Sequence, residues 1–277
     1  MTKIAHLTDL HLLEDDHAER RGLDRVRLSY LSFGRPRSAE RRRLRALQAL
    51  EAARDAGADH VVVTGDLTED GTDAQFRVLA RVLRDSGVPP SRVTLVPGNH
   101  DMYSDDGAWD RALSGPLARY RATSAPGGVI HLPGVVVVAV STAFRQHFTL
   151  ARGRVDSTQL DLVRRVAVEA RRSGRAVVLA QHHPPLAHGV PLVHWIEGLV
   201  DHEPLLRVLE AHDHVTVLHG HTHEHADRPV RVGGVRRVFS ARPTATGVGL
   251  RCYRLAHRRL WPEPVELASA GYGLATA

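Results

Sequence analysis

The chain has 277 residues, 43% hydrophobic and 25% charged, which is long enough to bury a large core and excludes a disordered protein. Its net charge is +6, but Lys3 is the only lysine among 37 basic residues, so a bias toward arginine explains the charge as well as a polyanionic partner does. The single cysteine, Cys252, excludes an internal disulfide and a cysteine-based metal site. The amino terminus has no signal-peptide pattern, and no apolar stretch could span a bilayer, so we expect a cytoplasmic protein.

Apolar runs and helical patterns alternate along most of the chain, which predicts an α/β fold. The expected strands cover residues 3–8, 60–64, 92–96, 135–141, 176–181 and 215–218. Apolar residues at helical spacing predict helices around residues 44–53, 76–83 and 160–167. After residue 228, closely spaced runs at 230–232, 236–240 and 249–255 predict an antiparallel second sheet. We expect one domain, residues 1–262, and a C-terminal tail, residues 263–277.

Polar side chains that can bind metal or transfer protons follow five of the expected strands. In chain order they are Asp9 and His11, then Asp66, then Asn99, His100 and Asp101, then His182 and His183, and finally His221 and His223. Open α/β sheets bind ligands outside the carboxyl ends of their strands, so these groups are expected to meet. Each block alone is also compatible with a turn or a polar loop. The ordered set therefore carries the prediction.

The blocks DxH, GD, GNHD, HHxP and GHxH, over about residues 4–240, resemble the calcineurin-like metallophosphoesterase family. The resemblance is strongest to its bacterial cyclic-nucleotide phosphodiesterase-type members. It implies a four-layer α/β/β/α sandwich of two packed mixed sheets, with a dinuclear metal site at the C-terminal ends of strands.

The resemblance also assigns roles to individual residues. The first ion would be held by Asp9, His11, Asp66 and His223. The second would be held by Asp66, Asn99, His182 and His221, so that Asp66 bridges the two ions. His182 is chosen over His183 because it matches the His-x-Pro block. His100 would stabilise the transition state or protonate the leaving oxygen, and Asp101 could hold the tautomer of His100.

Two divalent ions can hold a hydroxide for in-line attack on phosphorus. Together with two carboxylates and the hydroxide, the ions carry a net charge of about +1, which suits a singly charged phosphodiester. Oxygen and nitrogen ligands without cysteine suit Mn²⁺, Fe or Zn²⁺. The resemblance therefore implies a dimetal-dependent phosphohydrolase that cleaves a phosphodiester, with a cyclic or small nucleotide favoured. The alternatives are a lipid or glycerol phosphodiesterase or pyrophosphatase, a nuclease, and a metallophosphoesterase-fold scaffold without activity.

Two segments, residues 14–38 and 184–200, exceed the minimal pattern and are apolar for loops. They are expected to form either a cap, in which Trp195 and Tyr30 or Phe33 contact the organic part of the substrate, or the interface of a homodimer. The arginine-rich stretch 35–45 predicts a solvent-exposed helix start with Ser38 as its N-cap. Alternatively, its arginines bind a second phosphate, an anionic membrane surface or nucleic acid.

Overall fold

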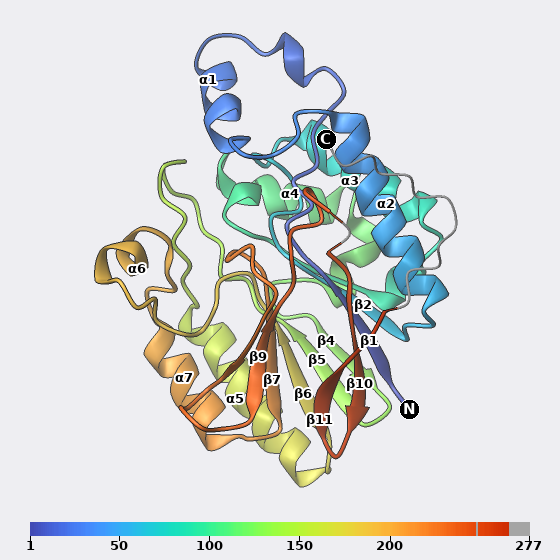
Figure 1. Cartoon of the computed structure of the whole chain (residues 1–277), viewed down its shortest axis with the longest axis vertical. Coiled ribbons are helices and arrows are strands. Elements are labelled where there is room, and N and C mark those ends of the chain that lie inside the picture. The colour runs from blue at the N-terminus through green and yellow to red at the C-terminus, as the bar shows by residue number, and fades with distance from the viewer. Residues whose placement is uncertain (248, 266–277) are drawn as a thin grey trace.

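The computed structural model describes residues 1–247 and 249–265, and it has two mixed β-sheets packed face to face with helices on both outer sides (Figure 1). This arrangement confirms the predicted four-layer sandwich. The first sheet has five strands in the order β11-β10-β1-β2-β3, and the second has six in the order β4-β5-β6-β7-β9-β8.

The first sheet consists of β1 (Lys3–Leu7), β2 (His60–Thr64), β3 (Val93–Val96), β10 (Arg251–Ala256) and β11 (Arg259–Glu263). Its outer face is covered by α2 (Ala39–Asp55), α3 (Asp73–Asp85) and α4 (Ala108–Ser114). Alternation along β2 shows how one strand serves two cores. Val61 and Val63 pack against the helices, whereas Val62 packs against the other sheet, because successive side chains of a strand point to opposite faces.

The second sheet consists of β4 (Val129–Leu132), β5 (Val135–Ala139), β6 (Ala176–Ala180), β7 (Val215–His219), β8 (Ala226–Pro229) and β9 (Arg236–Ser240). Helices α5 (Ser157–Arg172) and α7 (His202–Ala211) pack on its outer face. Strands β5, β6 and β7 are parallel and fully buried, which explains their nearly continuous valine and alanine runs. Short 3₁₀ helices connect elements at His17–Glu19, Pro90–Arg92, His100–Met102 and Ala118–Thr123.

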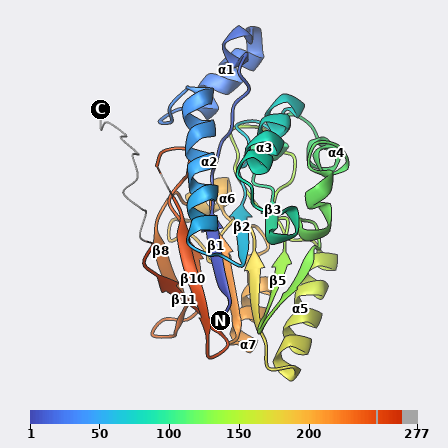
Figure 2. The ribbon, with the colours of Figure 1, turned by 90° about the vertical axis from the view of Figure 1, so that its right-hand side faces the viewer.

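The two additional segments contain helices. Residues 14–38, here called the insertion, include α1 (Gly22–Leu31), which Figure 2 shows beyond the end of α2 that is farthest from the N-terminus. Residues 184–200 include α6 (Pro191–Glu197), which the proline at its first position and the following Gly198 delimit. None of the helices in the described ranges is long and apolar enough to cross a membrane.

The expected antiparallel second sheet after residue 228 is wrong. Strand β9 pairs parallel to β7 in the second sheet, while β10 pairs antiparallel to β1 in the first. The strand expected at 230–232 is also absent, because β8 ends at Pro229 and Val232 lies fully exposed in the following turn. A sequence pattern indicates strand propensity but not the partner strand, which tertiary packing selects. Strand β11 ends at Glu263, and residues 266–277 of the predicted tail lie outside the described residues.

Candidate metal centre

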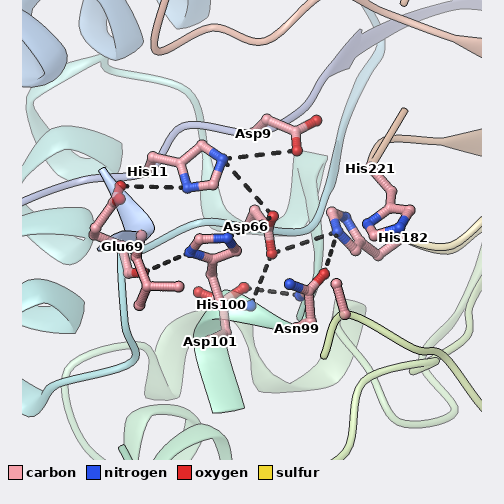
Figure 3. A network of polar contacts seen from close by, with 12 residues as sticks. Asp9, His11, Asp66, Glu69, Asn99, His100, Asp101, His182 and His221 are labelled. Atoms are coloured by element: carbon pink, nitrogen blue, oxygen red, sulfur yellow. Dashed lines mark hydrogen bonds and ion pairs between the residues drawn. The ribbon is translucent and has the colours of Figure 1, made fainter. Parts of the chain in front are cut away.

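The ends of β1, β2, β3, β6 and β7 bring the predicted ligands to one place (Figure 3). Ligand atoms that lie within 4.8 Å of one another form four groups, namely Asp9 with His11 and His223; His11 with Asp66 and His100; Asp9 with Asp66 and His182; and His182 with His183 and His221. The groups share members, so they form one continuous cluster rather than separate sites.

The backbone is unusual at five of these residues. Within the described residues, seven non-glycine residues have left-handed φ angles, and five of them are predicted ligands: Asp9 (53°), His11 (47°), Asp66 (49°), His221 (70°) and His223 (55°). Non-glycine residues rarely adopt this conformation, and such strain concentrates at functional sites. The fold therefore turns the chain sharply after β1, β2 and β7 and directs these side chains toward a common point.

Asp66 lies at the centre of the cluster. Its Oδ1 is 3.4 Å from His182 Nε2, and its Oδ2 is 3.7 Å from His11 Nε2 and 3.9 Å from His100 Nε2. The two carboxylate oxygens thus face different halves of the site. This is the placement expected of a carboxylate that bridges two ions.

The first half of the site contains buried polar atoms without hydrogen-bond partners, which are Asp9 Oδ1 and both ring nitrogens of His11. Asp9 Oδ1 is also 3.3 Å from His223 Nε2, whose side chain is half exposed at the rim. Unpartnered buried polar atoms cost free energy unless another group satisfies them. A cation between Asp9, His11 and Asp66 would satisfy Asp9 Oδ1 and the Nε2 of His11, so the donor set fits a metal.

In the second half, hydrogen bonds direct His182 and Asn99. His182 Nδ1 donates to the Thr64 carbonyl at 2.8 Å, which leaves Nε2 facing Asp66 and 3.2 Å from Asn99 Oδ1. The Asn99 amide nitrogen donates to the Tyr103 hydroxyl at 2.8 Å, so its oxygen is the atom directed toward His182. These partners fix the orientation of ligand atoms, as supporting hydrogen bonds do in metal sites.

The neighbouring His183 is used differently. Its Nδ1 is 2.7 Å from Thr142 Oγ1 and its Nε2 donates to the Ala151 carbonyl at 3.0 Å, so both nitrogens have protein partners. Neither partner of His183 belongs to the predicted ligand set, whereas His182 Nε2 faces Asp66 and Asn99, and this difference favours His182 as the ligand. His221 Nε2 pairs with the Glu197 carbonyl at 2.8 Å, which links this predicted ligand to the end of α6.

Two glycines are required by close packing in the site. A Cβ atom at Gly98 would overlap the Asp66 carboxylate, and one at Gly220 would overlap Thr8 Oγ1. The glycines of the GNHD and GHxH blocks therefore allow the backbone to approach the carboxylates.

Burial and neighbouring charges shift the pKa values of three predicted ligands. Burial alone would raise the pKa of Asp66, but His182 and His100 outweigh it and hold the pKa well below its usual range. Burial lowers the pKa of His182, but Asp66 reverses this and raises it to about 9. Burial, assisted by His182, lowers the pKa of His221 to about 3, so its ring is neutral. A cation would displace the proton on His182, because metal ligands must be deprotonated.

The expectation that Asp101 holds the tautomer of His100 is wrong. His100 Nδ1 donates instead to the Glu69 carbonyl at 2.6 Å. The Asp101 carboxylate accepts from the backbone N–H groups of Leu67, Thr68 and Gly98 at 2.8–3.0 Å. Asp101 therefore joins the loops that follow β2 and β3, and it acts on loop geometry rather than on His100.

The arginine-rich stretch is only partly a solvated helix start. Ser38 Oγ caps α2 by accepting from the Arg41 N–H, as predicted. Arg42, however, is fully buried and contacts Glu69, and Arg35 Nη2 donates to Glu69 Oε1 at 3.0 Å. The sequence reasoning did not assign a role to Glu69. The one sequence feature that could have indicated a role is its position three residues after the predicted ligand Asp66, in GDLTE.

A pocket of about 490 Å³ lies next to Asn99 and His100. Its other walls come from the insertion, the loop before α5 and the end of α6, and include Tyr30, Phe33, Arg35, Phe148 and Ile196. Tyr30 and Phe148 meet edge to face with ring centroids 5.5 Å apart. Trp195, which we expected here, does not line this pocket and has the Arg152 guanidinium 5.5 Å from its ring centroid. Phe148 was missed because nothing in its sequence neighbourhood indicates the site.

Comparison with known proteins identifies the family. The model of the calcineurin-like phosphoesterase family matches residues 2–225. The chain belongs to the calcineurin-like phosphoesterase family.

Three relatives bear names of cyclic-nucleotide enzymes. A probable cyclic nucleotide phosphodiesterase of Synechococcus is 28% identical over 80% of this chain and 73% of its own length. One of Rhodococcus erythropolis is 31% identical over 65% and 56%, and a cAMP/cGMP dual specificity phosphodiesterase of Mycobacterium tuberculosis is 28% identical over 60% and 48%. The chain thus matches about half the length of the latter two.

Solved structures agree on the fold. A dimetal phosphatase from Danio rerio superposes with a TM-score of 0.64 at 16% identity, covering 92% of each chain. A Thermus thermophilus protein superposes with a TM-score of 0.52 at 13% identity, covering 95% of this chain and 99% of its own. This calcineurin-like phosphoesterase is a metal-dependent phosphoesterase.

Proposed function

We propose that this phosphoesterase hydrolyses the phosphodiester bond of a small nucleotide, foremost a cyclic nucleotide. The pocket formed by Tyr30, Phe33 and Phe148 beside His100 is the observation that carries this choice. Aromatic rings bind nucleobases by stacking, which contributes about 1–3 kcal/mol per base. The names of the three relatives point to the same substrate class.

Two ions would be held at this site, one by Asp9, His11, Asp66 and His223 and the other by Asp66, Asn99, His182 and His221. When bound, divalent ions of the Mn²⁺, Fe or Zn²⁺ type supply the nucleophile and neutralise phosphoryl charge. His182 and Asn99 keep their ligand atoms directed inward through the Thr64 carbonyl and the Tyr103 hydroxyl.

His100 is proposed as the residue that assists departure of the leaving oxygen. Because its Nδ1 is held by the Glu69 carbonyl, Nε2 faces the site. A protonated His100 can therefore give the Nε2 proton to the oxygen that leaves phosphorus. The same hydrogen bond keeps the ring from rotating away from the pocket.

The test is a substrate panel with purified protein and Mn²⁺: cyclic nucleotides, glycerophosphocholine, single-stranded DNA and bis-p-nitrophenyl phosphate. Preferred turnover of cyclic nucleotides supports the proposal. Preferred turnover of DNA would replace it with the nuclease alternative, and no turnover of any diester would refute diester hydrolysis.

Variants locate the specificity. Phe148→Ala should raise KM for a cyclic nucleotide about 5- to 100-fold, the equivalent of one lost stacking contact. Hydrolysis of glycerophosphocholine, which has no ring to stack, should be unaffected. Trp195→Ala is the matched control, because Trp195 is an exposed aromatic residue outside the pocket lining. Equal KM for the nucleotide in both variants would contradict a role for the pocket.

A lipid-derived phosphodiester is the second candidate, because large apolar side chains are exposed on the insertion and on α6. Leu23 and Phe33 are 86% and 87% exposed, and Leu192 and Trp195 are 65% and 59% exposed. Such side chains can contact a membrane surface, with arginines of the insertion near anionic headgroups. Binding to phosphatidylglycerol vesicles that Phe33→Ser abolishes would favour this candidate, whereas a homodimer would appear in light scattering.

A further inference from the structure

Glu69 is a fully buried carboxylate in the loop after β2. Its Oε1 accepts hydrogen bonds from Ser32 Oγ at 2.9 Å and from Arg35 Nη2 at 3.0 Å, and its Oε2 pairs with Arg42. Ser32 and Arg35 belong to the insertion, and Arg42 belongs to the first turn of α2. Glu69 thus anchors the insertion to the core and pairs with two guanidinium groups.

Glu69 also contacts a predicted metal ligand, His11, and the proposed proton donor, His100 (Figure 3). Its Oε2 is 3.4 Å from His11 Nδ1, and its carbonyl oxygen accepts from His100 Nδ1 at 2.6 Å. Neither ring nitrogen of His11 makes a hydrogen bond, although the ring is fully buried. When a histidine binds a metal through one nitrogen, the other usually donates to a carboxylate or carbonyl, which fixes the ring orientation. Glu69 is the carboxylate placed to accept from His11.

We propose that Glu69 is a positioning residue that orients the His11 imidazole for the metal and thereby couples metal binding to docking of the insertion. The inference rests on the proposed metal centre. An ion on His11 Nε2 requires the proton on Nδ1, which then bonds to Glu69 Oε2. That bond holds the carboxylate in the position where Ser32 and Arg35 bind it. Because coupling free energies are reciprocal, a docked insertion favours the ion as much as the ion favours docking.

The adjacent Asp70 provides a matched control. It is also fully buried and also anchors the insertion, accepting from Arg20 Nη1 at 2.6 Å and Arg27 Nη2 at 2.9 Å. Among the residues that the structure describes, it bonds to no predicted metal ligand. Asp70→Asn therefore loosens the insertion without removing the partner of His11, whereas Glu69→Gln affects both.

The first experiment titrates Mn²⁺ into chelator-treated full-length protein by calorimetry. Glu69→Gln should weaken one of the two ions about 10- to 100-fold, as loss of a ligand's supporting carboxylate does in other metal sites. Asp70→Asn should weaken the same ion clearly less, because it loosens the insertion but keeps the partner of His11. Unchanged affinities in Glu69→Gln would overturn the inference, and so would equal weakening in both variants, because that would indicate general loosening. A wild type that binds no ion would overturn the metal centre itself.

The second experiment measures tryptic cleavage after Arg21 and Arg25, exposed residues of the insertion, by mass spectrometry with and without Mn²⁺. Mn²⁺ should slow this cleavage in the wild type and in Asp70→Asn, but not in Glu69→Gln. Equal slowing in all three proteins would refute the coupling. Glu69→Asp serves if Gln does not fold, because it keeps the charge beside Arg35 and Arg42 while withdrawing the carboxylate from His11. It should weaken the same ion.

Discussion

His60, at the start of β2, is predicted to make the protein acid-sensitive. Its ring is fully buried and its Nε2 pairs with Thr94 Oγ1 at 2.7 Å. Burial lowers the pKa of His60 to about 4, from an ordinary histidine pKa of 6.5. The unfolded chain therefore binds a proton that the folded protein excludes between these two values. Stability from this group is complete above about pH 6.5 and falls as the pH decreases toward about 4.

The size of the effect follows from the two pKa values. At about pH 5, the difference in protonation costs roughly 2 kcal/mol of unfolding free energy, since one pKa unit is 1.36 kcal/mol. Urea denaturation of chelator-treated protein at about pH 7.5 and pH 5 measures it. The fall in unfolding free energy between the two pH values should be about 2 kcal/mol smaller in His60→Gln than in the wild type. His131→Gln, which replaces an exposed histidine of β4, is the control and should lose as much stability as the wild type. If His60→Gln loses as much stability as the wild type, the assigned burial effect is wrong.

Further predictions concern the site. Purified protein should contain about two transition-metal ions; Asp66→Ala should lower the occupancy of both and His223→Ala mainly of one, measured by elemental analysis, and activity after exhaustive chelation would contradict this. His100→Ala should retain its metal yet lose about 10²–10⁴ in turnover of a substrate with a poor leaving group, with a smaller loss for p-nitrophenolate; loss of metal would instead identify His100 as a ligand. Gly98→Ala should abolish metal binding, because its Cβ would overlap the Asp66 carboxylate; normal metal content would show that the loop can shift.

The sequence determined the parts of the protein that are encoded locally. Runs such as the four consecutive valines of 135–138 predict buried parallel strands, because every side chain of such a strand faces a core. Candidate ligands were also readable as polar residues after strand ends, such as Asp9 and His11 or His221 and His223, and the family resemblance gave their proposed roles. Short strands, sharp turns and glycines at close approaches leave a local signature that needs no knowledge of the fold.

Tertiary structure alone decided which segments meet. The strands after residue 228 belong to both sheets, because strand propensity does not specify the partner strand and tertiary packing does. Arg42 and Glu69 are far apart in sequence, and they are buried because α2 packs on the loop after β2. Phe148 lines the pocket and Trp195 does not, because the direction of each side chain depends on how the loop before α5 and helix α6 pack against the core. Such long-range contacts depend on the whole fold, so no window of sequence contains them.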